Sequence, residues 1–272
     1  MTIHKALQKA AFYLKDLERP LFESEILLGF VLKKERIFLH CNAQKELDSF
    51  DEDSFFRLIE RRKNHEPLEY LIESVSFYEN KFYISYGALI PRPETEILVE
   101  KARVLIQEKN LQNIAEIGIG SGAISISLAK LFSNAKFYAS DISPFALFNA
   151  FVNLKKFDLQ NLELFRSNLL DFAQNIKIDI LVSNPPYIKD SYVLPKNVQK
   201  EPKIALFGGK KGDEILHKII KIAFDKKIPY VLCEMGYDQK KSIFDFAQNF
   251  SYKHLEFYKD FAGLDRGFVL EF

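Results

Sequence analysis

Cysteine is scarce in this chain of 272 residues, which contains only Cys41 and Cys233, far apart in the sequence. Two isolated cysteines provide neither a cluster of metal ligands nor the spacing of a disulfide framework. The histidines are equally scattered, so no metal site is expected. Cysteines used this sparingly are typical of a reducing compartment, where thiols stay free. We therefore expect a cytoplasmic protein.

A surplus of charge is also absent, since 38 Lys and Arg face 37 Asp and Glu, for a formal net charge of +1. Neutralising the phosphates of a nucleic acid takes an excess of basic side chains, so no direct nucleic-acid binding is expected. No apolar run approaches the roughly 18 residues of a membrane span. The N-terminus lacks the apolar core of a signal peptide. We expect a protein outside the membrane and, as the simplest assembly, a monomer.

The hydrophobic fraction of 47% is enough to build a large core. Apolar residues recur at helical spacing in 3–14, 20–31 and 54–63, which predicts a helical N-terminal domain at 1–73. Aromatic and β-branched residues then flank the polar segment 79–81, which indicates a β-hairpin within a linker at 74–90.

The segment 91–272 alternates between short apolar runs and amphipathic stretches, which indicates a mostly parallel sheet with helices on both faces. The last two strands are separated by a short loop, so at least one pairing there must be antiparallel. The predicted helices are 95–109, 123–132, 144–157 and 213–225. The predicted strands are 114–117, 136–140, 162–165, 178–182, 230–234, 254–258 and 268–272.

A glycine-rich turn follows the first of these strands and reads Gly118-Ile119-Gly120-Ser121-Gly122. Glycines at every second position let the backbone turn sharply and approach a ligand without Cβ atoms in between. The spacing differs from the Gly-x-Gly-x-x-Gly of dinucleotide binders, and no phosphate loop with Gly-Lys-Ser or Gly-Lys-Thr is present. Phosphoryl transfer is therefore not expected, and a purely structural turn is the alternative.

Asp141 ends the next predicted strand, 23 residues after Gly118. A carboxylate at this place can accept hydrogen bonds from both ribose hydroxyls of a bound nucleoside. A helix N-cap is the alternative, although Ser143 before Pro144 already suits that position. Together with the glycine turn, Asp141 indicates a site for an adenosine group without a pyrophosphate.

The tetrapeptide Asn184-Pro185-Pro186-Tyr187 directly follows the predicted strand 178–182. Ligands of open α/β sheets bind at the carboxyl ends of strands, so chemistry is expected here. The side-chain oxygen of Asn184 and the backbone carbonyl of Pro185 are two acceptors, which match the two hydrogens of a flat NH₂ group. The Tyr187 ring can lie against the same flat group.

These residue types suit methyl transfer to an amide or aromatic amine nitrogen, whose delocalised lone pair makes it a poor nucleophile. Two fixed acceptors aim the lone pair along the methyl–sulfur axis of a sulfonium donor and favour charge building on nitrogen. The sulfonium is already activated, so neither a metal nor a dedicated general base is expected. The prediction is an S-adenosylmethionine-dependent methyltransferase, and the alternative is a proline-rich strand exit without chemistry.

Several separate motifs, spread over nearly the whole chain, resemble those of one family. They are 61–62 with 66–71, 89–96, 118–124, 141–143, 183–188, 201–202 with 205–206 and 208–209, and 259–260 with 262–263 and 265–266. The chain resembles the protein-(glutamine) methyltransferases that modify class-1 peptide-chain release factors. The tetrapeptide alone is shared with adenine amino-methyltransferases, whereas the Pro-Arg-Pro-Glu-Thr-Glu segment at 91–96 is far more specific.

The resemblance implies an α/β fold, namely a seven-stranded S-adenosylmethionine-dependent methyltransferase (Rossmann-like) sheet with a small helical N-terminal domain. It implies a partner-binding role for 1–73, a methyltransferase domain at 91–272, and the glutamine of a Gly-Gly-Gln motif as target. The cofactor would be held by Gly118, Ile119, Gly120, Ser121, Gly122, Asp141, Asn168, Leu169 and Asn184. The substrate glutamine would be held by Asn184, Pro185, Pro186 and Tyr187, with Asn184, Pro185 and Tyr187 acting in catalysis.

Four residues depart from the family pattern. Glu116 stands where relatives commonly carry Asp. Asn168 lies in the region where an acidic side chain often sits beside the adenine, although an amide can also contact an adenine edge. Lys210 and Lys211 add two positive charges to a loop that is usually acidic.

Two other functions compete with this interpretation. One is an amino-methyltransferase acting on a base in nucleic acid, which shares the chemistry but is expected to carry a basic surface that this composition does not suggest. The other is a methyltransferase scaffold that only binds translation factors. Failure to bind S-adenosylmethionine would favour this second alternative, although the intact glycine turn and tetrapeptide argue against it.

Overall fold

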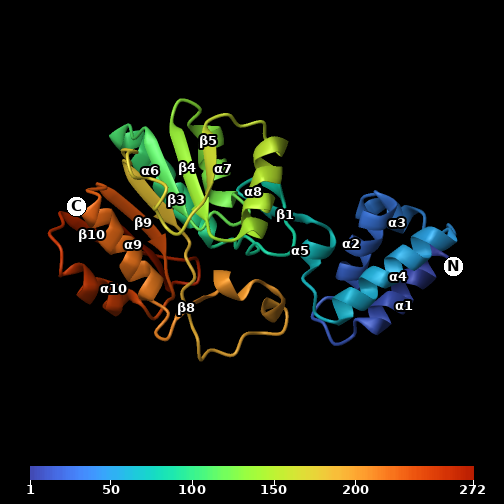
Figure 1. Ribbon diagram of the computed structural model, residues 1–272. Coiled ribbons are helices and arrows are strands. Elements are labelled where there is room, and N and C mark those ends of the chain that lie inside the picture. The colour runs from blue at the N-terminus through green and yellow to red at the C-terminus, as the bar shows by residue number, and fades with distance from the viewer. The chain divides into compact units, whose positions relative to one another are not determined.

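A computed structural model describes all residues from Met1 to Phe272, and the chain divides into two compact units (Figure 1). One unit comprises Met1–Ser74 and Pro195–Lys200, and the other comprises Val75–Leu194 and Glu201–Phe272. None of the helices combines the length and apolar character needed to cross a bilayer.

The first unit is helical, as the spacing of its apolar residues predicts. Its elements are α1 (Ile3–Tyr13), α2 (Pro20–Leu32), α3 (Arg36–Cys41), α4 (Ser49–Lys63), α5 (Leu68–Leu71) and the 3₁₀ turn η1 (Val198–Lys200). Helix α4 begins before the predicted residue 54, because the Asp48 side chain accepts a hydrogen bond from the Asp51 N–H and so caps an earlier start. The short helices α3 and α5 were not predicted.

The core of this unit is formed by the apolar faces of α1, α2 and α4, where Ile3, Leu27 and Phe55 are fully buried. An ion pair between Arg62 of α4 and Glu23 of α2 joins two of these helices, and both side chains are largely shielded from water. Burial of apolar surface is the main source of stability for such a bundle.

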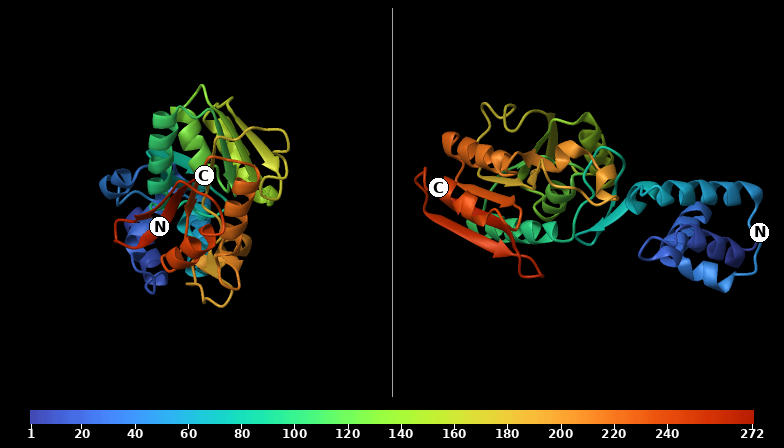
Figure 2. Two further views of the ribbon diagram at one scale, coloured as in Figure 1. Left: turned by 90° about the vertical axis from the view of Figure 1, so that its left-hand side faces the viewer. Right: turned by 90° about the horizontal axis from the view of Figure 1, so that it is seen from below.

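The second unit contains a seven-stranded sheet with helices on both faces, which confirms the predicted fold class (Figures 1 and 2). The strand order is β10-β11-β9-β6-β3-β4-β5. The strands are β3 (Asn113–Ile117), β4 (Lys136–Asp141), β5 (Leu162–Arg166), β6 (Ile180–Ser183), β9 (Tyr230–Glu234), β10 (His254–Lys259) and β11 (Asp265–Glu271). Neighbours from β9 to β5 are parallel, whereas β11 is antiparallel to both β9 and β10, as the short final loop required.

Alternating residues of the central strands bury the two faces of this sheet. Ile114 and Val182 face the cluster formed with α6 (Thr95–Lys109), α7 (Ala123–Leu131) and α8 (Pro144–Lys156). Ala115 and Leu181 face the cluster formed with α9 (Glu214–Asp225) and α10 (Lys240–Ala247). Helix α10 was not predicted.

Two small sheets complete the second unit. Strands β1 (Ser74–Phe77) and β2 (Asn80–Tyr83) form the predicted hairpin, and β2 is tied to α8 because the Asn153 side chain bonds both the N–H and the carbonyl of Tyr83. Strands β7 (Ile188–Lys189) and β8 (Phe207–Gly209), with the 3₁₀ turn η2 (Lys203–Ala205) before β8, were not predicted. The β7–β8 pair fixes the chain on the far side of the tetrapeptide.

Candidate active site

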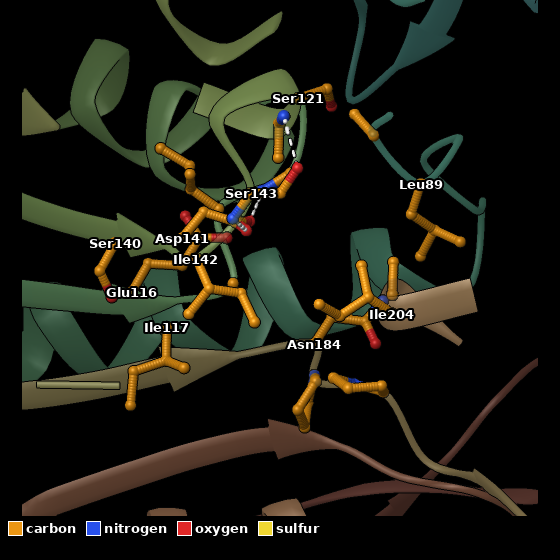
Figure 3. Close-up of a pocket in the computed structure, with 18 of the residues that line it drawn as sticks. Leu89, Glu116, Ile117, Ser121, Ser140, Asp141, Ile142, Ser143, Asn184 and Ile204 are labelled. Atoms are coloured by element: carbon orange, nitrogen blue, oxygen red, sulfur yellow. Dashed lines mark hydrogen bonds between the residues drawn. The ribbon is translucent and has the colours of Figure 1, made fainter. Parts of the chain in front are cut away.

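A cavity opens at the carboxyl edge of the sheet, where β3 and β6 lie side by side (Figure 3). After β3 the chain crosses to β4 on one side, and after β6 it crosses to β9 on the other side. The connections that follow these two paired strands therefore leave in opposite directions. Such a switch point leaves a crevice between the loops, where ligands of open α/β sheets bind. The lining comes from the segments after β3, β4, β5 and β6, from 87–95 and from η2.

Most of the residues singled out from the sequence meet in this cavity. Its lining includes Gly118, Ile119, Gly120, Ser121, Asp141, Asn168, Leu169, Asn184, Pro185 and Pro186. Gly122 and Tyr187 do not line it.

The glycine turn is open toward the cavity at two of its three glycines. Gly118 and Gly120 have φ values of +75° and +57°, and a Cβ atom at either would meet no atom within 4 Å. Gly122 has a φ of +87° and serves packing, because its Cβ would come within 2.6 Å of the Ile126 side chain. The first two glycines therefore leave free space for a ligand, and the third allows the start of α7 to pack closely against α8.

Asp141 holds the glycine turn and the next loop together. Its carboxylate accepts hydrogen bonds from the Gly120 N–H at 3.1 Å and the Ser143 N–H at 2.9 Å (Figure 3). Burial raises the pKa of Asp141, and these backbone donors oppose that rise. The Ser143 hydroxyl, and not Asp141, caps α8 by accepting from the Ala146 N–H. Asp141 therefore lines the cavity as a carboxylate with no role in capping the helix.

The tetrapeptide lies across the cavity from Asp141, and in Figure 3 Asn184 and Ile204 are grouped apart from Asp141 and Glu116. The Asn184 Nδ2 donates a hydrogen bond to the Thr95 hydroxyl at 3.0 Å. No group of the chain donates to the Asn184 Oδ1 or to the Pro185 carbonyl. Both proposed acceptors are therefore available to a ligand.

Tyr187 has contacts of a different kind from those expected of a ring against the substrate. Its hydroxyl donates to the Glu234 carboxylate at 2.9 Å, and its ring packs against the cluster beneath α9 and α10. Burial, with the nearby charge of Glu234, raises the pKa of Tyr187, so this hydroxyl stays protonated. Tyr187 thus anchors the end of the tetrapeptide.

The glycines of the 208–212 loop brace the tetrapeptide from the side. A Cβ on Gly208 would lie 2.4 Å from the Pro186 carbonyl oxygen, and one on Gly212 would lie 2.5 Å from the Tyr187 carbonyl oxygen. The Gln239 Nε2 donates to that same Tyr187 carbonyl at 2.9 Å. The close approach of this loop to the backbone of the tetrapeptide leaves no room for a side chain at Gly208 or Gly212. Lys210 and Lys211, which lie between them, are exposed.

We expect Gly208→Ala to destabilise the fold by ~1–3 kcal/mol and to lower turnover, because the added methyl group must displace the backbone of the tetrapeptide. Urea unfolding and methyl-transfer rates measure the two effects. Gly29→Ala is the matched control, since its Cβ would also lie within 3 Å of a backbone oxygen, at 2.8 Å from the Lys34 carbonyl, but in the helical unit. Equal losses in both variants would show that the close approach to the Pro186 carbonyl is not the cause.

Glu116 is a buried carboxyl at the edge of the cavity, with 1% of its surface exposed. Burial raises its pKa to about 8, although the Ser125 N–H donates to it and opposes the shift. Glu116 is therefore mostly protonated and uncharged at neutral pH. The position that differs from the family pattern, with Glu in place of Asp, therefore carries an uncharged group.

A carboxyl whose pKa is raised by folding binds more protons in the folded state, so its contribution to stability falls as the pH rises from about 4.5 to about 8. Over this pH range the free energy of unfolding of Glu116→Gln is expected to fall by up to a few kcal/mol less than that of wild type, because the amide is uncharged throughout. Urea unfolding at about pH 5 and about pH 9 measures it. The exposed Glu163→Gln is the control, and parallel pH curves for wild type and Glu116→Gln would contradict the assignment.

An ion pair fixes the loop that closes one side of the cavity. Glu201, which is 4% exposed, accepts from the Arg92 guanidinium and from the Ile90 N–H. Because η2 follows Glu201 directly, this pair places Ile204 and Ala205 at the lining. Arg92 therefore acts through the loop and does not itself line the cavity.

The lining fits a nucleoside with an uncharged or cationic tail. It contains a carboxylate at Asp141, which can accept hydrogen bonds from hydroxyl groups, open backbone at Gly118 and Gly120, and apolar surface at Ile119, Ile142 and Leu169, against which a base can pack. No Lys or Arg lines the cavity, which disfavours a ligand with phosphates. S-adenosylmethionine, a nucleoside that carries no phosphate, matches this lining. The fold and the site together define a Rossmann-like, S-adenosylmethionine-dependent methyltransferase.

Sequence similarity to known proteins supports this class and identifies a family within it. Residues 5–72 match the family described as PrmC N-terminal domain, and residues 93–201 match the methyltransferase small domain. The release factor glutamine methyltransferase of Clostridium acetobutylicum is 35% identical over 98% of this chain and 97% of its own length. That of Buchnera aphidicola subsp. Schizaphis graminum is 37% identical over 98% of each. The chain belongs to the release factor glutamine methyltransferase family.

The fold is shared more widely than the family. The catalytic domain of hMettl16, solved in complex with MAT2A 3'UTR hairpin 1, superposes with a TM-score of 0.58 at 13% identity. That likeness covers 90% of this chain and 91% of the other, and it concerns the fold alone.

Sequence reasoning did not identify three residues that the structure places beside the tetrapeptide. The sequence indicates Thr95 as a helix start within the 89–96 motif, Glu234 as the end of a strand, and Arg266 as part of the last motif, but it assigns none of them to the site. A carboxylate at the carboxyl end of a fully buried strand was the available indication for Glu234, because burial of a charge demands partners. Nothing in the sequence pairs Glu234 with Thr95, which is 139 positions earlier.

Proposed function

We propose that this protein transfers a methyl group from S-adenosylmethionine to the side-chain amide nitrogen of the glutamine in the Gly-Gly-Gln motif of class-1 release factors. The observation that carries the proposal is a pair of acceptors to which no group of the chain donates, the Asn184 Oδ1 and the Pro185 carbonyl, in a cavity that fits the cofactor. Family membership supplies the release factor as the kind of substrate.

The proposed cofactor residues are Gly118, Ile119, Gly120, Ser121, Asp141, Asn168, Leu169 and Asn184, with Gly122 acting through the shape of the turn. When bound, S-adenosylmethionine supplies a methyl group on a positively charged sulfur, which is a good leaving group. The residues of the chain hold the ligand, exclude water and orient the target, and none of them needs to form a covalent bond.

The tetrapeptide supplies the orientation. Asn184 and Pro185 accept the two hydrogens of the glutamine NH₂, which fixes the plane of the amide and turns its nitrogen lone pair in one direction. The same two oxygens stabilise the positive charge that develops on nitrogen as it is alkylated, before a proton leaves to solvent. Pro186 keeps the turn rigid, since its ring fixes φ. Tyr187 anchors the turn and contributes to catalysis through it.

The remaining assignments rest on family membership and on composition. The helical domain at 1–73 supplies contacts to the release factor, the hairpin segment 74–90 is the linker, and 91–272 performs the transfer. The protein acts in the cytoplasm as a monomer and does not need to bind nucleic acid.

The test is incubation of the protein with S-adenosylmethionine labelled in its methyl group and a purified release factor. We expect one label per release factor, located at the Gly-Gly-Gln glutamine by mass spectrometry, and none on a release factor with that glutamine replaced by alanine. Ribosomal RNA and duplex DNA are the competing substrates. Label on nucleic acid but not on the release factor would overturn the proposal in favour of a base methyltransferase.

A further inference from the structure

A buried chain of hydrogen bonds runs behind the tetrapeptide. The Asn184 Nδ2 donates to the Thr95 Oγ1 at 3.0 Å, and the Thr95 hydroxyl donates to the Glu234 Oε2 at 2.6 Å. The Tyr187 hydroxyl donates to the other oxygen, Oε1, at 2.9 Å. Thr95 is 3% exposed and Glu234 is 1% exposed, so water does not compete for these bonds.

The sheet brings these residues together from distant parts of the sequence. Strands β6 and β9 are parallel neighbours, with Ser183 paired to Cys233, so Asn184 and Glu234 follow at the same level. Thr95 is the first residue of α6, which packs over this part of the sheet, and it also lines the cavity. The juxtaposition is therefore a product of the fold and not of local sequence.

The bonds have a fixed direction, because each oxygen of Glu234 accepts from a different hydroxyl. The Thr95 hydroxyl therefore donates its single hydrogen to Glu234, and only its lone pairs remain for Asn184. Asn184 must then present its Nδ2 to Thr95, which leaves its Oδ1 directed away from Thr95. A flipped Asn184 amide would set two acceptors against each other and would offer the substrate a donor.

We propose that Thr95 and Glu234 are positioning residues, which fix the side-chain amide of Asn184 with its oxygen toward the substrate NH₂. This inference rests on the proposed function of Asn184 as an acceptor. It assigns a task to Thr95 within the 91–96 motif and to the strand-end Glu234, neither of which touches the reacting atoms.

A third motif supports the same carboxylate from the other side. Arg266 on β11 bonds the Asp260 Oδ2 at 2.7 Å and 3.1 Å, and Asp260 also accepts from the N–H groups of Ala262 and Leu264, which fixes the turn before β11. Burial raises the pKa of Glu234, and the Thr95 and Tyr187 hydroxyls and the charge of Arg266 oppose that rise. The motif at 259–266 thus fixes Arg266, whose positive charge acts on the Glu234 carboxyl group.

The first test compares Thr95→Val with Thr95→Ser. Valine has the shape of threonine without the hydroxyl, so we expect the kcat for release-factor methylation to fall by roughly 10-fold or more, with KM for S-adenosylmethionine within about 2-fold. Serine restores the hydroxyl and is expected to recover kcat to within about 3-fold of wild type. Equal kcat values for Thr95→Val and wild type, or equal loss in both variants, would overturn the proposal.

The second test ranks two replacements of Glu234. Glu234→Gln can still accept from Thr95 through its carbonyl while its NH₂ faces the Tyr187 oxygen, whereas Glu234→Leu offers no acceptor. We therefore expect Glu234→Leu to lose more kcat than Glu234→Gln, by roughly 5-fold or more. The exposed Glu163→Gln is the control and should match wild type. The reverse order of the two Glu234 variants would contradict a directional chain.

A spectroscopic test keeps the inference separate from the proposed function. The side-chain NH₂ resonances of Asn184, assigned by their loss in Asn184→Asp, are expected to exchange slowly in wild type and Thr95→Ser and rapidly in Thr95→Val. Unchanged resonances in Thr95→Val would overturn the positioning role even if the enzyme is active. A wild-type protein that fails to methylate any release factor would overturn the proposed function, and the NMR comparison would still decide the orientation of Asn184.

Discussion

Replacing Asn184 by alanine is expected to lower the turnover of release-factor methylation by roughly 100- to 1,000-fold, the usual effect of losing one positioned hydrogen-bonding group at the reacting centre. The affinity for S-adenosylmethionine is expected to stay nearly unchanged, because the other proposed cofactor residues are all retained, among them Asp141 and the glycine turn on the other side of the cavity (Figure 3). Single-turnover rates and calorimetric titration measure the two quantities.

Two controls make this prediction specific. Asn175→Ala changes an exposed asparagine outside the cavity and should behave as wild type. Asn184→Asp keeps an acceptor but loses the Nδ2 donor to Thr95 and adds a charge, so it should retain the fold while turning over poorly. Near-normal turnover of Asn184→Ala would remove Asn184 from the mechanism.

The second large effect concerns the cofactor. Asp141→Ala is expected to weaken S-adenosylmethionine binding by ~1–3 kcal/mol, or about 5- to 150-fold in affinity, from loss of charge-assisted hydrogen bonds. Part of that loss arises through the glycine turn, since Asp141 also accepts from the Gly120 and Ser143 N–H groups.

Asp141→Asn retains one of these backbone bonds. The amide oxygen can still accept from either the Gly120 or the Ser143 N–H, but the NH₂ group cannot accept from the other, and the side chain carries no charge for the ribose hydroxyls. We expect its affinity to lie between those of wild type and Asp141→Ala. Unchanged affinity in both variants would mean that the ribose is held elsewhere.

The fold could be predicted from the sequence because its elements are locally encoded. Alternation of apolar runs with amphipathic stretches required parallel pairing, and the short loop before β11 required an antiparallel pair at the edge. The elements that were missed have one local and one long-range cause. The capping Asp48 extended α4, and β7 and β8 are short segments whose pairing depends on contacts between distant parts of the chain.

The candidate site was predictable where its residues follow strands, since the carboxyl ends of parallel strands meet at one edge. Gly118, Asp141 and Asn184 were found in this way. The supports of Asn184 could not be found, because the bond between Thr95 and Glu234 joins residues that only the finished sheet brings together. Gly122 and Tyr187 illustrate the converse, as they belong to the right motifs but serve packing and anchoring instead of lining the cavity.

The most direct measurement is a crystal structure of the protein with S-adenosylhomocysteine and a release factor bound. We predict that the glutamine amide nitrogen lies within about 3.2 Å of both the Asn184 Oδ1 and the Pro185 carbonyl oxygen, and that its free face is directed at the sulfur. A glutamine amide bonded to other groups, with residues 184–187 directed away from the sulfur, would contradict the account.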